Sequence, residues 1–502
     1  MKGLVAVDVG TTSMRAILYD ATGRALHVDR RPNAPSYLEG GRVEQDPRSW
    51  QACLVSTLGS CREAAGRAGI ELACISVTAQ RSSVMPVDAA GTPLHPAIMW
   101  QDTRAAGLAH SLQGADAMVY RKTGLRISPV FSAIKMAWLR RNLPEVWRST
   151  HKLLGVQDWV LYLLTGRFVT DHSLGSRTNL LDLATRDWDP ELLALFEVPR
   201  EKLCELVPPG AVAGALAADI ASRTGLAGGL PVVSAGGDQQ CAALGLGLFS
   251  SRHAVANTGT GSYLIGHADR PALDAGMRVS CNVSAAPGAY IVEAAMLTTG
   301  AVHQWFRELL SPDGGGATVS PEALEREAAR VPAGSNGLVL LPHFMGSGSP
   351  HWDPQARGAF VNLSMSTTRG TMARAILEAI AIELAQGLDV VESLCGQVQA
   401  VHASGGMTKS ALFNQVQSDV LERPVLRFEG SEATAQGAWI AGCVATGLAG
   451  THAEAFARLS ERKPPDRYDP DPATRDAYRR QRLRSQAIYD ALAAPAIREL
   501  FG

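Results

Sequence analysis

The first twenty residues, MKGLVAVDVGTTSMRAILYD, combine a carboxylate with a turn of small and hydroxyl side chains. Residues 3–8 are apolar and β-leaning, which predicts a buried strand, and residues 16–19 predict a second one. The turn between them, 10–13, offers backbone N–H groups and hydroxyls that can hold a phosphate. Asp8, at the base of the turn, could then bind Mg²⁺, which prefers oxygen ligands. The alternative is an ordinary hairpin with a glycine turn.

A second stretch of the same design follows about 250 residues later, half the chain away. Residues 253–266, HAVANTGTGSYLIG, predict a strand, a small turn at 258–261 and another strand. A repeat at this distance indicates duplication of a whole domain, because solenoid repeats are much shorter. We therefore expect two domains, residues 1–247 and 248–502, which grip the phosphates of a nucleotide from both sides.

Asp238 stands between a predicted strand, 231–236, and an Ala/Leu-rich helix. A carboxylate at this junction is either a helix N-cap or a group aimed into a cleft. In a cleft it could act as a general base that takes a proton from an alcohol.

Two polar clusters, AQRSS at 79–83 and WQDTR at 100–104, also follow short predicted strands. Strand ends are where an open α/β sheet usually binds ligands. The alternative for Arg81 is a surface salt bridge, and for Asp102 it is the N-cap of a helix over 103–112.

Helices and strands alternate along the rest of the chain, which predicts an α/β protein. Residues 50–66 and 371–393 have apolar positions at helical spacing. A strand over 398–403 leads into Gly405 and Gly406, and a helix over 410–421 follows. Glycines before a helix let a ligand approach the backbone.

Composition narrows the class of protein. The chain has 502 residues, which suits two large domains, and a net charge of −1, which indicates neither a nucleic-acid partner nor a membrane surface. The eight cysteines form no C-x-x-C pair, which predicts buried thiols in a reducing cytoplasm. Asp8 interrupts the first apolar run, so we expect no signal peptide, and no apolar run reaches the roughly 18 residues of a membrane helix.

Several well-known motifs are missing from the sequence. It contains no G-x-x-x-x-G-K-[ST], no G-x-G-x-x-G, no protein-kinase catalytic loop and no G-x-S-x-G. Phosphoryl transfer needs phosphate cradles, a metal and a positioned nucleophile, with little covalent chemistry from the protein. The two turns, Asp8 and Asp238 offer these parts.

The motifs together resemble those of the FGGY carbohydrate kinases, within the actin-like ATPase superfamily. DVGTTSMRAILYD and NTGTGSYLIG resemble the two phosphate motifs, ASGGM with EATAQGAWIAG resembles the adenosine region, and WDPQARGAF also matches. The resemblance covers nearly the whole chain. It implies two ribonuclease-H-like domains flanking a deep cleft, with ATP against the second domain and a small sugar or polyol in the first.

The resemblance also implies roles for individual residues. GGDQQCAALGLG resembles the stretch that holds the catalytic aspartate, which implies that Asp238 is the base, while Asp8 stays the expected Mg²⁺ ligand. The residues assigned to ATP are Thr11, Thr12, Ser13, Arg15, Thr260, Gly300, Gln304, Gly405, Gly406 and Ser410. Those assigned to the sugar are Arg81, Ser82, Trp100, Asp102, Asp238 and Gln239.

Departures from the family pattern bear on the substrate. Ser82 stands where glycerol kinases have a Glu that holds glycerol, Val130 where they have a Tyr, and Ser410 where they usually have Asn. Xylulokinases usually have Q-M-H-G at the first of these positions, so neither pattern fits, while WQDTR favours glycerol kinase and PHWDPQARGAF favours xylulokinase-like members. Our first choice is an ATP- and Mg²⁺-dependent kinase of a ketopentose such as D-xylulose.

Two alternatives remain open. One is a glycerol or tetritol kinase of the same family, and the other is a non-catalytic actin-like nucleotide-binding protein. The sequence also leaves a homodimer open.

Overall fold

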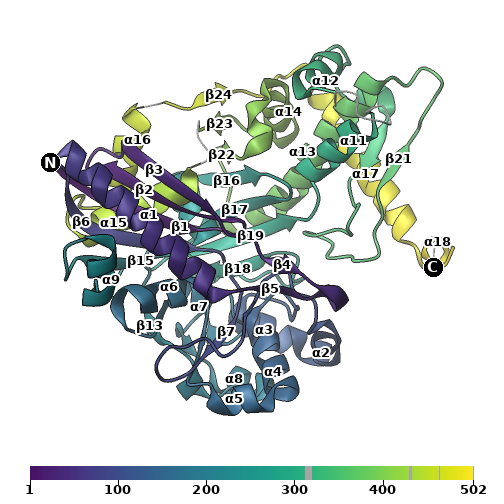
Figure 1. The fold of residues 1–502 in the computed structure, drawn as a ribbon. Coiled ribbons are helices and arrows are strands. Elements are labelled where there is room, and N and C mark those ends of the chain that lie inside the picture. The colour runs from purple at the N-terminus through teal and green to yellow at the C-terminus, as the bar shows by residue number, and fades with distance from the viewer. Residues whose placement is uncertain (311–318, 429–431, 463, 501–502) are drawn as a thin grey trace.

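The structure, a computed structural model, describes residues 1–310, 319–428, 432–462 and 464–500. Two large β-sheets organise it (Figure 1). In the first sheet, β1 pairs antiparallel with β2 and parallel with β6. Its strands, in spatial order, are β14 (Val212–Ala215), β15 (Pro231–Gly237), β6 (Glu71–Ala79), β1 (Lys2–Val9), β2 (Ser13–Asp20) and β3 (Ala25–Pro32).

The second sheet repeats this pairing with residues from the other half of the chain. There β16 pairs antiparallel with β17 and parallel with β22. The strands, in spatial order, are β18 (Ser280–Val283), β19 (Tyr290–Met296), β17 (Ser262–Ala268), β16 (His253–Thr258), β22 (Ala400–Ser404), β23 (Val425–Arg427) and β24 (Asp466–Tyr468). The expected α/β fold with two ribonuclease-H-like domains is confirmed. The boundary near residue 248 stays a prediction.

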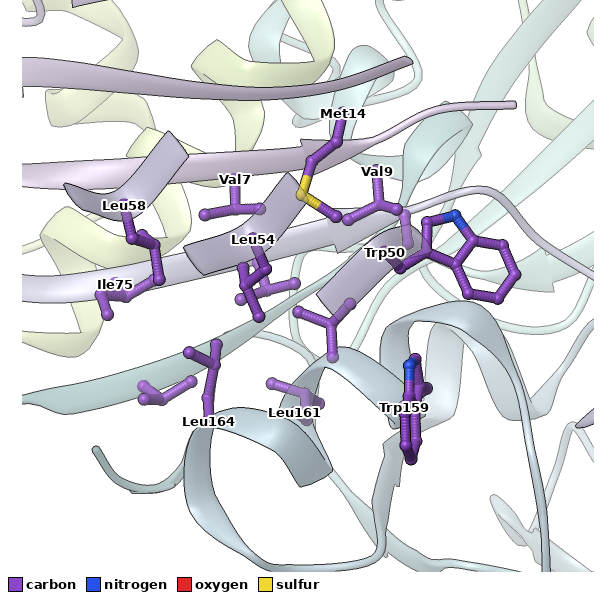
Figure 2. Packing of buried hydrophobic residues seen from close by; sticks show 14 of the residues in the cluster. Val7, Val9, Met14, Trp50, Leu54, Leu58, Ile75, Trp159, Leu161 and Leu164 are labelled. Carbon is purple, nitrogen blue, oxygen red and sulfur yellow. The ribbon is translucent and has the colours of Figure 1, made fainter. Parts of the chain in front are cut away.

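Alternating residues of β1 are buried on opposite faces of the first sheet. Val5, Val7 and Val9 pack with α1 (Pro47–Ala68) and α6 (Val156–Thr165). Figure 2 shows this contact, in which Trp50 and Leu54 of α1 and Leu161 of α6 converge on the strands. Burial of each such side chain contributes about 1.5–3 kcal/mol, so these contacts hold the strand whose end carries Asp8.

The other face of this sheet is covered by a helix from the second half of the chain. Leu4 and Ala6 of β1 pack with α15 (Ala433–Ala445), which also lies against α10 (Asp238–Gly245). The two helices touch through glycines: a Cβ on Gly437 would lie 1.9 Å from the carbonyl oxygen of Cys241. This close crossing fixes α10, the helix that begins with Asp238, against the second domain.

The second domain is built around α13 (Arg369–Cys395), a mostly buried helix that packs on β17 and β19 and against α14 (Ala411–Leu421). The sequence predicted both helices to within two residues at each end. The last long helix, α17 (Arg475–Ala493), packs on α14.

A smaller body of short helices forms a third hydrophobic cluster, which the sequence did not indicate. The remaining helices of the described chain are α2 (Ala106–Ser111), α3 (Asp116–Thr123), α4 (Ser132–Asn142), α5 (Pro144–Ser149), α7 (His172–Gly175), α8 (Pro190–Phe196), α9 (Ala218–Thr224), α11 (Gly300–Leu309), α12 (Pro321–Ala328), α16 (His452–Arg462) and α18 (Pro495–Arg498). The remaining strands are β4 (Ser36–Tyr37), β5 (Val43–Gln45), β7 (Met85–Val87), β8 (Ala97–Ile98), β9 (Lys152–Leu154), β10 (Val169–Asp171), β11 (Leu181–Asp182), β12 (Asp187–Trp188), β13 (Glu205–Val207), β20 (Val339–Leu341) and β21 (Ala359–Val361). Within the described ranges, none of the helices has the length and apolar character needed to cross a bilayer.

Candidate active site

The turn between β1 and β2 is closed by an ion pair across the hairpin. Asp8 and Arg15 are register partners, and the guanidinium of Arg15 bonds Asp8 Oδ2. Arg15 Nη1 also lies 3.3 Å from Oε1 of Glu432, just before α15. Arg15, expected at the nucleotide, therefore holds the predicted metal ligand and links the two domains.

Asp8 suits the hard cation proposed for it. Mg²⁺ usually keeps several waters and takes only one or two protein carboxylates beside the substrate phosphates. The described residues contain no group of three or more His, Cys, Asp or Glu side chains arranged to hold a metal. A single carboxylate beside a turn that is predicted to bind phosphate is compatible with this pattern.

Thr11 links the first turn to the predicted sugar residues. Its hydroxyl donates to Gln80 Oε1 at 3.3 Å and accepts from Trp100 Nε1 at 3.2 Å. Thr12 is exposed at the tip of the turn, and Ser13 Oγ accepts from Arg30 Nε at 3.0 Å. The turn is therefore braced from several sides and presents Thr12 outward.

The second turn is packed against two glycines predicted to contact ATP. A Cβ on Gly300 would lie 2.3 Å from the carbonyl oxygen of Gly259, and one on Gly405 would lie 2.4 Å from that of Thr258. Gly405 also has φ +99°, which side chains rarely adopt. The structure thus brings Gly300 and Gly405 to the turn that exposes Thr260.

The other predicted nucleotide residues differ in how free they are. A Cβ on Gly406 would meet nothing within 4 Å, so the backbone there borders open space. Gln304 is exposed on α11 and donates to Glu308. Ser410 caps α14 by accepting from Phe413 N and donates to Glu325 Oε1 at 2.7 Å. Its hydroxyl is thus engaged within the protein.

Asp238 is the first residue of α10 and not its N-cap, which is Gly237. Its Oδ1 lies 3.3 Å from Arg81 Nε and accepts from the N–H of Gln239 at 2.7 Å. Burial raises the pKa of Asp238, Arg81 opposes this, and the nearby charge of Asp8 adds to it. A carboxylate with a raised pKa is a stronger base when ionised, as a general base requires.

Two of the predicted sugar residues lie beside Asp238. They are Arg81 and Gln239. The buried Oε1 of Gln239 has no hydrogen-bond partner in the described chain. Buried polar atoms normally have partners, so this oxygen is available to accept a further hydrogen bond.

Three residues that the sequence analysis did not identify complete this cluster: Glu293, Arg177 and Tyr263. Glu293 of β19 accepts from Arg81 and from Arg177, which follows α7. Arg81 also lies over the Tyr263 ring, 6.0 Å from its centre. A lone carboxylate in the apolar strand YIVEAAM was a usable signal for Glu293, whereas nothing local marked Arg177.

Ser82 and the segment with Val130 are tied together by a buried lysine. Lys135 Nζ donates to the carbonyl oxygens of Ser82 at 3.3 Å, Pro129 at 2.6 Å and Val130 at 2.5 Å. Ser82 has φ +67°, and its hydroxyl donates to the carbonyl oxygen of Arg177. The left-handed backbone costs about 1 kcal/mol for a residue with a Cβ, so contacts such as these must hold it.

Asp102 needs a correction, because its carboxylate is fully engaged within the protein. It accepts from the N–H of Val43 at 2.6 Å and from the Arg104 guanidinium, and its side chain is 0% exposed. It is not the N-cap of α2 either, since that cap is Ala105. Asp102 therefore fastens the segment around Trp100 and offers no free oxygen to a sugar.

Comparisons with known proteins agree with this architecture. The family model "FGGY family of carbohydrate kinases, N-terminal domain" matches residues 4–245, and the C-terminal domain model matches residues 254–446. Glycerol kinase of Alkalilimnicola ehrlichii is 35% identical over 481 residues, 92% of this chain and 94% of the relative. Glycerol kinase of Gloeobacter violaceus is 36% identical over 465 residues, 90% of each chain.

Solved structures of the same family superpose over almost the whole chain. The ligand-bound xylulose kinase from Lactobacillus acidophilus has a TM-score of 0.91 at 26% identity and covers 99% of both chains. The gluconate kinase from Lactobacillus acidophilus has a TM-score of 0.91 at 25% identity, covering 98% of this chain and 99% of that one. The chain therefore belongs to the FGGY family of carbohydrate kinases.

Proposed function

We propose that this kinase transfers the γ-phosphate of ATP to a hydroxyl of glycerol or another short polyol. The observation that carries the proposal is the 35% identity to a glycerol kinase across 92% of the chain. The xylulose kinase with the same fold is 26% identical. Our first choice from the sequence, a ketopentose such as D-xylulose, becomes the second candidate.

The residues around Asp238 suit acid–base work on an alcohol. Asp238 would take the proton of the attacking hydroxyl, a role typically worth 10²–10⁴-fold in rate. The guanidinium of Arg81, which donates several hydrogen bonds, and the side-chain amide of Gln239, which donates and accepts, would orient the polyol beside Asp238. Neither Ser82 nor Val130 supplies the polar group that glycerol kinases have, yet Glu293 places a buried carboxylate 2.9 Å from Arg81. A short substrate would therefore still meet an Arg81 guanidinium that Glu293 holds in place.

The two turns would hold the nucleotide from opposite domains, with Thr11 and Thr12 on one side and Thr260, Gly300, Gly405 and Gly406 on the other. Mg²⁺ bound at Asp8 would neutralise negative charge on the phosphate oxygens. Closure of the two domains over both substrates would exclude water and so limit the hydrolysis of ATP.

Steady-state kinetics on glycerol, erythritol, D-xylulose, L-xylulose and D-ribulose, at fixed ATP and Mg²⁺, test the substrate. We expect kcat/KM for glycerol or erythritol to exceed that for each ketopentose by at least about tenfold, which corresponds to ~1.4 kcal/mol of transition-state binding. A higher kcat/KM for D-xylulose would support the second candidate. Release of ADP with none of the five would count against the proposed substrate class.

A further inference from the structure

We propose that Glu293 is a positioning residue that reaches from the second domain into the sugar side of the site and fixes Arg81 beside Asp238. This inference rests on the proposed function, in which Arg81 contacts the polyol. Glu293 itself is not placed on the substrate, because both of its carboxylate oxygens are engaged by arginines.

The ion pairs around Glu293 form a continuous network between the two domains. Arg177 Nη1 lies 3.3 Å from Glu293 Oε1, and Arg81 Nη1 lies 2.9 Å from Glu293 Oε2. The other edge of the Arg81 guanidinium, its Nε, lies 3.3 Å from Asp238 Oδ1. Arg81 is therefore shared between a carboxylate of each domain.

Burial of Glu293 strengthens its interaction with Arg81. The side chain is only 3% exposed, and that of Arg81 is 7% exposed, so solvent screens their interaction little. The two arginines hold the pKa of Glu293 below its usual range despite its burial, so it stays ionised. Asn282 of β18 also accepts a hydrogen bond from Arg177. Arg177 is therefore held by two residues of the second domain, Asn282 and Glu293.

The balance of charges around Arg81 explains how Glu293 affects the basicity of Asp238. Arg81 and Arg177 are two cations in one buried cluster, and Asp238 would be the nearest anion to Arg81 if Glu293 were absent. Arg81 would then interact more strongly with Asp238 and stabilise its ionised form. Glu293 instead neutralises part of the Arg81 charge while Arg81 stays beside Asp238, which leaves Asp238 more basic.

The ionisable groups that face this pair come from several elements. Asp238 is influenced by Arg81 after β6, by Asp8 of β1 and by Glu293 of β19. Glu293 faces Arg81 and Arg177, and the phenol of Tyr263 in β17 lies among the same charges. A change in the pKa of Asp238 after substitution of Glu293 therefore has to be interpreted together with the charges of these groups.

The test compares Glu293→Gln with the parent and with Glu378→Gln. Glu378 is a matched control, since it is buried, lies 2.9 Å from Arg374 and accepts from Ser335, but belongs to α13. For Glu293→Gln we expect the KM for glycerol to rise roughly tenfold, the size of a weakened charged hydrogen bond, with the KM for ATP unchanged within twofold. The acidic limb of kcat/KM should move to lower pH, because the charge of Glu293, which raises the pKa of Asp238, is lost.

Two further measurements keep the outcome interpretable. Glu293→Asp keeps the charge, so we expect it to retain the acidic limb of the parent. Modification of Arg81 by phenylglyoxal, followed by peptide mass spectrometry, needs no turnover and should be faster in Glu293→Gln than in the parent or in Glu378→Gln.

The outcomes separate this inference from the proposed function. An unchanged modification rate of Arg81 in Glu293→Gln, or changes in KM and pH profile equal to those of Glu378→Gln, would overturn the role of Glu293. A parent enzyme that phosphorylates none of the sugars and polyols would instead overturn the proposed substrate class, and the modification rates would still decide the role of Glu293.

Discussion

Trp100 Nε1 donates a 3.2 Å hydrogen bond to Thr11 Oγ1, and this bond joins a predicted sugar residue to the first phosphate turn. Thr11→Val removes the acceptor but keeps the shape of the side chain. A buried donor left without a partner costs about 1–3 kcal/mol, and this partly buried donor should cost less, yet enough to shift the Trp100 loop. We expect both the KM for ATP and the KM for the polyol to rise several-fold in steady-state assays.

Thr12→Val is the control for this variant. Thr12 is exposed at the tip of the same turn, and no side-chain hydrogen bond of Thr12 is seen within the described chain. Its substitution should raise only the KM for ATP. Equal effects of the two variants on the polyol would show that the Trp100–Thr11 bond does not couple the two sites.

Asp238→Asn should fold and bind polyol but lose about 10²–10⁴-fold in kcat, because an amide cannot accept the proton. Asp189→Asn provides the comparison, since Asp189 is the N-cap of α8 and accepts from Glu191 N and Leu192 N. Circular dichroism and a coupled ADP assay on both variants separate the roles. A kcat for Asp238→Asn within a few-fold of the parent would mean that this carboxylate only supports the start of α10.

The pH dependence of the parent follows from the same carboxylate. Burial raises the pKa of Asp238 above the ordinary value for aspartate. Only the ionised form accepts a proton, so activity is lost as pH falls through this raised pKa. We expect the acidic limb of kcat/KM to lie above the roughly 3.9 of a free aspartate, and the limb should disappear in Asp238→Asn. A limb at or below that value would contradict the environment described here.

Gly405→Ala should destabilise the protein as well as weaken nucleotide binding. The new Cβ would lie 2.4 Å from the carbonyl oxygen of Thr258, and φ is +99°. We expect the Tm to fall by several degrees, as for a loss of about 1–3 kcal/mol. Gly406→Ala, whose Cβ would meet nothing within 4 Å, should leave the Tm unchanged and affect only the KM for ATP. Equal Tm values for the two variants would contradict the packing of Gly405 on the turn.

The α/β class and the division into two halves were predictable because their signals are local, whereas the ribonuclease-H-like architecture came from the family resemblance. Two hairpins of one design, strands ending in polar clusters, and long amphipathic segments all have short-range patterns, and α13 and α14 were located from them. The third hydrophobic cluster was missed although a helix over 103–112, which contains α2, was considered, because α2 itself has only six residues and nothing local shows what it packs against. Such helices are stabilised by tertiary contacts more than by their own sequence.

The site was predictable only where residues stand in motifs. Asp238, Arg81 and Gln239 come from such stretches, and the structure brings them together. Glu293 and Arg177 are distant from them in sequence, and their importance comes from pairing across the two domains. Asp102 is the reverse case: it stands in a motif that suggested a sugar contact, but its carboxylate accepts hydrogen bonds from Val43 and Arg104.

Lys135→Met should impair the polyol site while the overall fold is kept. Lys135 Nζ donates to the carbonyl oxygens of Ser82, Pro129 and Val130, so its loss frees the strained Ser82 segment next to Arg81. We expect the KM for the polyol to rise about tenfold and the KM for ATP to stay within twofold, because the ammonium group touches only the sugar side. Lys202→Met is the matched control, since Lys202 also donates to two carbonyl oxygens, those of Trp147 and Thr150. Isothermal titration with glycerol, alongside the kinetics, separates binding from turnover. If Lys202→Met raised the KM for the polyol as much as Lys135→Met did, the effect would come from general loosening of this part of the domain and not from the support of Ser82.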